Sequence, residues 1–342
     1  MNEKEILEKY PWLTKKNQKL IISPDSDGFL SALLYLNYFD AEVVGFYDGK
    51  IMVCPEDIDP RDCLFLDMDV YCKDIKSVGH HMVCYNKNRK PANWYNYDNC
   101  VQLNNLRNFD KYNDFSRKFP LATIHFLLAL LSKANRDIKI SDTAIVPLLF
   151  SDGVWKLLFG YTENCLDWFD WLHINDKDSI LYDVFCGENS FYNVMLEINT
   201  FLRKRDKLNS NVVYNMQTLE KEHKSGKRTG DKLLISNSNG DAINLEKQSS
   251  GLYNIVDEEK DRVQKFIELL ATLMGWDARL DKWNFKDFTI RKFKKSVLDG
   301  KGGHGKLNKA NYNAMAENHC FSMAITSGQT VEYTIDSEGY FN

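Results

Sequence analysis

Acidic and histidine side chains repeatedly follow short apolar runs in the N-terminal half of this sequence. The polar residues at these four places are Asp25 with Asp27, Asp67, His80 with His81, and Asp152. We expect the apolar runs to be buried strands, and open α/β sheets bind ligands beyond the carboxyl ends of their strands. Because Asp and His hold divalent metal ions in proteins, the pattern predicts a metal-dependent phosphoesterase centre.

The Asp-Ser-Asp-Gly segment at 25–28 suits this chemistry. Two carboxylates so close together repel each other, and a divalent cation relieves that repulsion. Asp67 from a neighbouring strand can bridge two ions, with His80 and Asp152 completing their shells. Two ions roughly 3.5–4 Å apart hold both the attacking and the leaving oxygen of a phosphoryl transfer. We expect two ions of Mn²⁺ or Mg²⁺, and the imidazole favours Mn²⁺.

A parallel sheet is needed to bring these side chains together. Residues 19–23, 42–47, 51–53 and 63–66 have the composition of strands, and 28–38 has the pattern of a helix. This alternation predicts an α/β fold with a mostly parallel sheet flanked by helices. Residues 145–150 are expected to form a further strand that ends at Asp152.

The C-terminal part has a different pattern. It predicts a hairpin at 232–245, a helix at 258–274, and strands at 288–290, 321–326 and 330–335, which is an α+β arrangement. We therefore expect a metal-dependent domain at 1–200, a linker at 201–212 and a smaller α+β domain at 213–342.

The overall composition is that of an ordinary globular protein. The 342 residues are 44% hydrophobic and 27% charged, with a net charge of −4, so bulk attraction to nucleic acid is not expected. No apolar run approaches the roughly 20 residues that span a bilayer. The N-terminus lacks a signal-peptide core, and the eight cysteines form no Cys-x-x-Cys pair. These features predict a cytoplasmic protein with reduced thiols and no membrane partner.

The order of the motifs resembles the DHH phosphoesterase superfamily, which includes nano-RNases, RecJ-like exonucleases, cyclic-dinucleotide phosphodiesterases and some pyrophosphatases. The resemblance is carried by 25–28 as the first motif, Asp67 as the second, His80-His81 as the third and Asp152 as the fourth. It implies that His81 contacts the scissile phosphate and that His80 and Asp67 take part in catalysis. The implied metal ligands are Asp25, Asp27, Asp67, His80 and Asp152.

Three features depart from the family pattern. The late glycine-rich loop lacks the small-residue tail that usually follows the family's GGGH motif, and two positions differ in the N-terminal motifs. Many members carry a histidine four residues before the first aspartate, where this chain has Ile21, and the triplet Asp-His-His is here Gly79-His80-His81. The first of these two changes removes a metal ligand. The second removes a carboxylate that orients a histidine, and such partners fix ligand geometry.

A glycine-rich basic stretch near the C-terminus resembles the GGGH loop that grips substrate in members with a DHHA1-like second domain. It contains Gly302, Gly303 and His304, with Lys301, Lys306 and Arg291 close by in the sequence. Backbone N–H groups at a helix N-terminus together with lysines attract phosphate. We expect these residues to bind the substrate.

Several acidic, basic and histidine residues have simpler interpretations. Asp25 or Asp27 alone would be a helix cap, and Asp69 is interpreted as a cap or a surface residue. His125 is expected to lie in the core. The basic run at 221–232 contains its own acids and is interpreted as a solvated loop.

Together these observations predict a phosphodiesterase or exonuclease-type hydrolase for short single-stranded nucleic acids or small nucleotides. The main alternative is a catalytically impaired DHH-like module that binds nucleotides or nucleic acid within a larger assembly, supported by Ile21 and Gly79. Inorganic pyrophosphatase activity is a third alternative. The sequence leaves open whether the partner is DNA, RNA or a dinucleotide, and whether the chain forms homo-oligomers or binds another protein.

Overall fold

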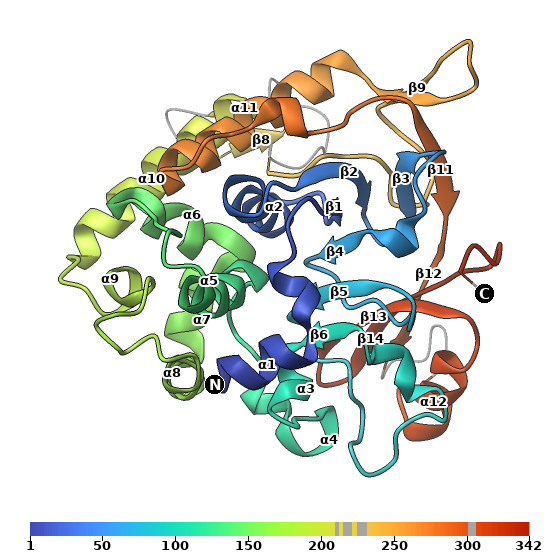
Figure 1. The fold of residues 1–342 in the computed structure, drawn as a ribbon, viewed down its shortest axis with the longest axis horizontal. Helices are drawn as coiled ribbons and strands as arrows, with labels where there is room; N and C mark the ends of the chain where they lie inside the picture. Colours follow the sequence, from blue (N-terminus) through green and yellow to red (C-terminus); the bar gives the residue numbers. More distant parts are fainter. Residues whose placement is uncertain (209–211, 215–220, 224–230, 300–305, 342) are drawn as a thin grey trace.

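The computed structural model describes residues 1–208, 212–214, 221–223, 231–299 and 306–341 (Figure 1). A nine-stranded sheet has the order β6-β5-β4-β1-β2-β3-β11-β10-β9. Its strands are β1 (Lys19–Ile22), β2 (Glu42–Tyr47), β3 (Ile51–Pro55), β4 (Leu64–Leu66), β5 (Lys76–Gly79), β6 (Cys100–Gln102), β9 (Leu245–Lys247), β10 (Tyr253–Ile255) and β11 (Phe288–Lys292). The predicted α/β class is confirmed, with a mixed sheet: β6 to β2 are parallel, and the pairs from β2 to β9 are antiparallel.

The register of the parallel strands aligns their carboxyl ends. Ile22 at the end of β1 pairs with Leu66 at the end of β4, and Leu66 in turn pairs with Val78 of β5. The residues that follow these strands therefore emerge at one edge of the sheet. This edge carries the first, second and third sequence motifs.

The two faces of the sheet are covered by different structures. One face packs against helices, with Leu20, Ile22 and Leu66 in the main apolar core. The other face has its own cluster, in which Ile21 and Phe65 lie with Phe321 of a three-stranded sheet. That sheet has the order β12-β14-β13, formed by β12 (Lys294–Asp299), β13 (Cys320–Ser327) and β14 (Thr330–Ile335).

The longer helices are grouped mostly on the left of the view in Figure 1. Those of seven residues or more are α1 (Glu3–Lys9), α2 (Ser26–Tyr38), α5 (Thr123–Ala134), α7 (Val154–Gly160), α8 (Thr162–Leu172), α10 (Phe191–Lys207), α11 (Asp257–Met274) and α12 (Lys309–Ala316). The shorter ones are α3 (Leu103–Leu106), α4 (Lys111–Asp114), α6 (Ile145–Phe150) and α9 (Tyr182–Phe185), and a separate pair of strands is β7 (Val212–Tyr214) with β8 (Lys221–His223).

The expected strand at 145–150 is wrong. These residues form α6, which continues through a 3₁₀ turn at Ser151–Gly153 into α7. An apolar run of six residues fits a buried helix as well as a buried strand, so its periodicity does not decide between them. Asp152 therefore approaches the sheet edge from a helix kink and not from a strand.

The large sheet contains strands from both sides of the expected domain boundary. β9, β10 and β11 come from residues 245–292, and they join the N-terminal strands through β3. The expected linker at 201–212 begins inside α10, which continues to Lys207. Rings of α2 and the C-terminal part are also in contact, since the centroid of Phe29 lies 6.2 Å from that of Phe266 in α11.

Within the described residues, the helical stretch Asp142–Gly160 has the length and composition of a membrane span, and 44% of its most apolar window is buried inside the protein. It is not a straight helix, because Asp152 and Gly153 have φ values of 51° and 67°. The stretch is broken at Asp152, a candidate metal ligand, and α6 within it contacts α10 and α11. These are features of a core segment.

Candidate metal centre

The two carboxylates of the 25–28 segment lie in different surroundings. Asp25 is the N-cap of α2, with Oδ1 accepting from the Gly28 N–H at 3.4 Å, so the helix-cap interpretation holds for this residue. Asp27 lies in the first turn of α2 and is 0% exposed. Its oxygens accept from the N–H groups of Thr123 at 2.7 Å and Ile124 at 2.9 Å. The N-terminus of α5 thus holds Asp27 in place.

Asp67 follows β4 and is connected to both neighbouring segments. Ser23 Oγ lies 2.7 Å from Asp67 Oδ2 and 2.7 Å from Asp25 Oδ1, and its single proton can serve one of them at a time. Thr123 Oγ1 donates to Asp67 Oδ1 at 2.9 Å. These contacts fix the Asp67 carboxylate between β1 and α5.

His80 follows β5 and faces carboxylates with both ring nitrogens. Its Nδ1 lies 2.9 Å from Thr123 Oγ1 and 3.2 Å from Asp67 Oδ1. Its Nε2 lies 3.5 Å from Asp152 Oδ2. Because Thr123 Oγ1 donates to Asp67, it accepts from His80, and this network assigns a proton to Nδ1. The assignment leaves Nε2 as the nitrogen that can bind an ion.

Four of the five predicted metal ligands are brought together. Asp27, Asp67, His80 and Asp152 each offer an atom, and these atoms lie within 4.8 Å of one another. Opposite oxygens around an octahedral Mg²⁺ are about 4.2 Å apart, given metal–oxygen distances of about 2.1 Å. The cluster therefore fits a single divalent ion after a small contraction, and its three carboxylates and one imidazole are donors that Mn²⁺ and Mg²⁺ accept.

Electrostatics within the cluster indicate a missing positive charge. Burial raises the pKa of Asp27 well above its usual value, and the charges of Asp67 and Asp152 raise it further. Burial also raises the pKa of Asp152, again with help from Asp67. Although burial opposes it, the carboxylates around His80 raise the pKa of this histidine to about 9. A bound cation would replace that proton and relieve the repulsion among the carboxylates.

Two of the four ligands have a left-handed backbone. The φ angle is 60° at Asp67 and 51° at Asp152. Non-glycine residues adopt this region rarely, Asp among the less unfavourable, and such residues cluster at functional sites. Here the conformation turns each carboxylate back from the end of its strand or helix towards His80.

Asp25 is not a member of the four-residue cluster. Its Oδ2 lies 3.3 Å from Nζ of Lys232, and the Asp25 side chain is 22% exposed. The charge of Asp25, with burial opposing, raises the pKa of Lys232. The interpretation of 221–232 as a solvated loop is therefore wrong at Lys232, which reaches the centre from the C-terminal half of the chain.

His81 lies at the open side of the cluster. Its ring stacks on that of His80, with centroids 4.2 Å apart, and its side chain is 42% exposed. Asp69 Oδ2 accepts from the His81 N–H at 3.2 Å and lies 3.2 Å from Nδ1. Asp69 is 4% exposed, so its interpretation as a cap or surface residue is wrong.

The glycine at position 79 makes this contact possible. A Cβ atom at Gly79 would come within 2.3 Å of Asp69 Oδ1 and 2.7 Å of the Met68 carbonyl carbon. The space of a side chain at 79 is thus filled by the Asp69 carboxylate. The sequence predicts that Gly79 costs the site a carboxylate that orients a histidine. This prediction is wrong, because Asp69 supplies such a carboxylate to His81.

The predicted substrate-binding residues are only partly described. Lys301, Gly302, Gly303 and His304 lie outside the described residues, so their prediction stays open. Lys306 is exposed and its backbone forms an isolated bridge with Asp299. Arg291 lies on β11, three strands away from β1, and its guanidinium donates to Cys54 Sγ at 2.7 Å.

Sequence reasoning missed four residues of the site: Ser23, Asp69, Thr123 and Lys232. Ser23 and Asp69 are each two residues from a predicted ligand, which is a usable signal. Thr123 begins the expected apolar helix, where threonine is an ordinary first residue. Lys232 precedes the apolar run Leu233 to Ile235, whose first and last residues are 1% and 0% exposed, and such a run indicates an anchored segment and not a free loop.

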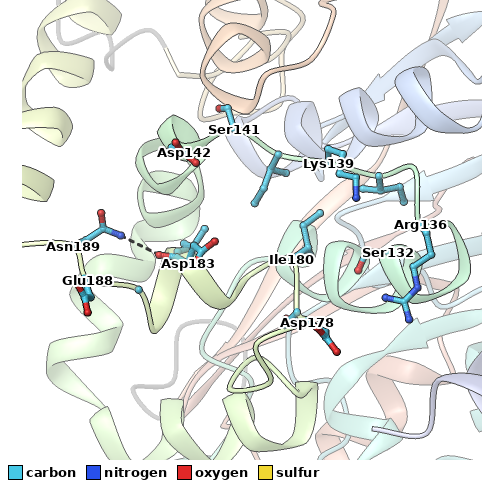
Figure 2. Close-up of a pocket in the computed structure, with 15 residues that line it drawn as sticks. Ser132, Arg136, Lys139, Ser141, Asp142, Asp178, Ile180, Asp183, Glu188 and Asn189 are labelled. Atoms are coloured by element: carbon cyan, nitrogen blue, oxygen red, sulfur yellow. Dashed lines mark hydrogen bonds between the residues drawn. The ribbon is translucent and has the colours of Figure 1, made fainter.

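A separate polar pocket of about 400 Å³ lies at the other end of α5 (Figure 2). It is lined by Ser132 near the helix end and by Arg136, Lys139, Asp178 and Asp183, whose main-chain oxygen accepts from Asn189 at 3.0 Å. Ser132 lies nine helical steps after Thr123, which corresponds to about 14 Å along α5. This pocket is therefore not part of the metal centre.

No protein-family model, curated protein or solved structure matches this chain. The resemblance to DHH phosphoesterases therefore stays a prediction from the sequence motifs.

Proposed function

We propose that this chain is a divalent-metal-dependent phosphoester hydrolase of the DHH type that acts on short single-stranded nucleic acids or small nucleotides. The observation that carries the proposal is the convergence of Asp27, Asp67, His80 and Asp152 on one point, with the half-exposed His81 ring beside it. These residues come from four separate segments, so their meeting is a property of the fold. Helix capping alone does not account for it.

Asp27, Asp67, His80 and Asp152 would hold the ion. When bound, such an ion neutralises phosphate charge and makes a water molecule more acidic. Asp27 is fixed by two backbone N–H groups of α5, and His80 by Thr123. These hydrogen-bond partners hold the ligands in position before the ion binds, so the site does not need to reorganise.

His81 would be the residue that contacts the phosphate. Asp69 holds its Nδ1 side, which directs Nε2 away from that contact, and the ring is open to solvent. An imidazole held in this way donates a proton or a hydrogen bond to an anionic oxygen. Mn²⁺ is the ion that the mixed carboxylate–imidazole set favours, with Mg²⁺ as the alternative.

One observation favours the binding-module alternative. Asp25, the fifth predicted ligand, is paired with Lys232, and Ile21 is fully buried in apolar surroundings. A two-ion mechanism needs a donor set at this place. If catalysis depends on a second ion there, the chain would bind its ligand without cleaving it.

The test is hydrolysis in the presence of Mn²⁺, Mg²⁺ or chelator. The substrates are labelled single-stranded DNA, short RNA, linear and cyclic dinucleotides, and pyrophosphate. We expect Mn²⁺-dependent turnover of a short oligonucleotide or dinucleotide, and its loss in Asp67→Asn. Asp57→Asn is the matched control, since it makes the same change at an exposed turn after β3.

Full Mn²⁺-dependent activity in Asp67→Asn would contradict the assignment of the centre. Metal-dependent retention of an oligonucleotide or dinucleotide without cleavage would favour the binding module. Turnover of pyrophosphate alone would establish the third alternative.

A further inference from the structure

We propose that the ammonium group of Lys232 occupies the place of a second cation beside Asp25, so that the centre holds a single divalent ion per chain. The inference rests on the proposed metal site and defines its composition. A permanent side-chain charge would then do part of the work that a second ion does in a two-ion centre.

The first observation is that both oxygens of Asp25 already have partners. Oδ1 lies 2.7 Å from Ser23 Oγ and accepts from the Gly28 N–H at 3.4 Å. Oδ2 lies 3.3 Å from Lys232 Nζ. An ion bound to Asp25 Oδ2 would compete with the ammonium group for that oxygen and would be repelled by its charge.

The second observation is that the backbone of Lys232 is fixed on both sides. The Leu233 N–H donates to the Pro24 carbonyl at 2.8 Å, which ties this segment to the turn that carries Asp25. The Lys232 carbonyl accepts from the Arg262 guanidinium, and the Leu234 N–H donates to Glu259 Oε1 at 2.8 Å. α11 therefore holds the segment from the other side, and Lys232 is delivered to Asp25 by a built support.

The third observation is that Asp25 belongs to no group of three or more donors within the described residues, so a second ion beside it would have few protein ligands and would bind weakly. Within the described ranges, Asp27, Asp67, His80 and Asp152 form the one group of three or more such donors, and Asp25 is outside it. Ile21 is 0% exposed and lies in the apolar cluster on the opposite face of the sheet. The Ile21 side chain thus has no atom that binds a metal ion, and it lies on the other face of the sheet.

The charges support the same composition. Asp25, Asp27, Asp67 and Asp152 carry four negative charges when ionised. One divalent ion and one ammonium group supply three positive charges, which leaves the centre nearly neutral before an anionic substrate binds. The Lys232 side chain is 41% exposed, so it can also meet a phosphate oxygen at the open side.

The experiment is a titration of the metal-free full chain with Mn²⁺. Calorimetry measures the binding, and electron paramagnetic resonance measures the Mn²⁺ that remains free. The variants are Lys232→Met, which removes the charge, and Lys232→Arg, which keeps it. Lys247→Met is the matched control, because this lysine is exposed on the edge strand β9. Thermal melting of each variant shows whether it is folded.

We expect one Mn²⁺ per chain in the native protein, in Lys232→Arg and in Lys247→Met, and a second, weaker Mn²⁺ in Lys232→Met. Asp25→Asn combined with Lys232→Met should return the count to one. Two ions in the native protein, or a single ion in Lys232→Met, would overturn the proposal while leaving the metal site intact. No Mn²⁺ in any variant would overturn the proposed function itself.

Discussion

Asp25 and Asp27 are two residues apart in the chain but belong to two different parts of the centre. Asp27 is 0% exposed and faces Asp67, His80 and Asp152 in the four-residue cluster, here called the closed part, where the Asp67 and His80 side chains are 6% and 11% exposed and Asp152, at 35%, lies at the rim. Asp25 lies at the margin, where the C-terminal half of the chain supplies Lys232. Protonated His80 is the positive group inside the closed part, whereas the open part has an ammonium group of its own.

This difference shows how the same residue type can do two kinds of work in one motif. Crowded carboxylates need a cation, and the raised pKa values of Asp27 and Asp152 express that need, whereas, although burial opposes it, hydrogen bonding to His80 lowers the pKa of Asp67. A carboxylate at a helix N-cap beside a lysine is already satisfied. The distinction depends on contacts from distant segments and not on the motif itself.

The largest effect is expected in the closed part. Asp67→Asn removes a ligand, and loss of a partner behind a ligand already costs roughly 10- to 100-fold. We therefore expect Mn²⁺ affinity and hydrolysis to fall by more than about 100-fold, measured by calorimetry and initial rates. An unchanged Mn²⁺ affinity in Asp67→Asn would remove the basis for a closed metal-binding part.

A smaller effect is expected beside the closed part, at Asp69. Asp69→Asn keeps the shape but removes the charge that holds His81, and we expect kcat to fall roughly 10- to 100-fold. Mn²⁺ affinity should change far less, because His81 is not in the cluster. Equal losses of kcat and Mn²⁺ affinity would contradict a role through His81.

Gly79→Ala tests the same contact from the other side. The added Cβ would lie 2.3 Å from Asp69 Oδ1, so the Asp69 carboxylate and the Met68 backbone must shift. We expect a loss of about 1–3 kcal/mol in the free energy of unfolding, measured by urea denaturation. Native stability together with native activity would show that this close packing has no consequence.

The open part should respond more weakly to loss of its carboxylate. Asp25→Asn removes a charge at a partly exposed position, which costs on the order of 1 kcal/mol, or about fivefold in Mn²⁺ affinity. The number of ions bound should stay at one. A loss as large as that of Asp67→Asn would make Asp25 a ligand and erase the contrast between the two parts.

The smallest effect on the metal centre is expected at His125, a core residue as predicted, which is 0% exposed and should affect stability rather than Mn²⁺ binding. Burial lowers the pKa of His125 from 6.5 to about 4. Between these values the unfolded chain binds more protons, so this histidine destabilises the fold as pH falls from 6.5 towards 4, by at most about 3 kcal/mol. His125→Asn should flatten that part of the pH–stability curve, and an unchanged slope would contradict a buried neutral imidazole.

Much of the parallel half could be predicted from the sequence. The strands at 42–47 and 63–66 and the helix after 25–28 follow from apolar pattern and turn residues, and their register then brings Asp67 and His80 to one edge. Strand ends in a parallel sheet meet at the same edge whatever the details of the loops. For this reason Asp27, Asp67 and His80 lie together, whereas Asp152 joins them from the kink between α6 and α7.

The remaining features depend on contacts that pattern does not encode. The six residues 145–150 suit a helix or a strand, and packing against α10 and α11 selects the helix. Asp69 became a histidine partner because Gly79 leaves it space, and Lys232 reaches Asp25 across more than 200 residues of chain. Such choices are made by tertiary structure.

The most direct test of the two-part centre is a crystal structure with Mn²⁺, in which anomalous scattering locates each ion. We expect one strong peak among Asp27, Asp67, His80 and Asp152, with Lys232 still beside Asp25. A second peak bound to Asp25, or no peak within the four-residue cluster, would contradict it.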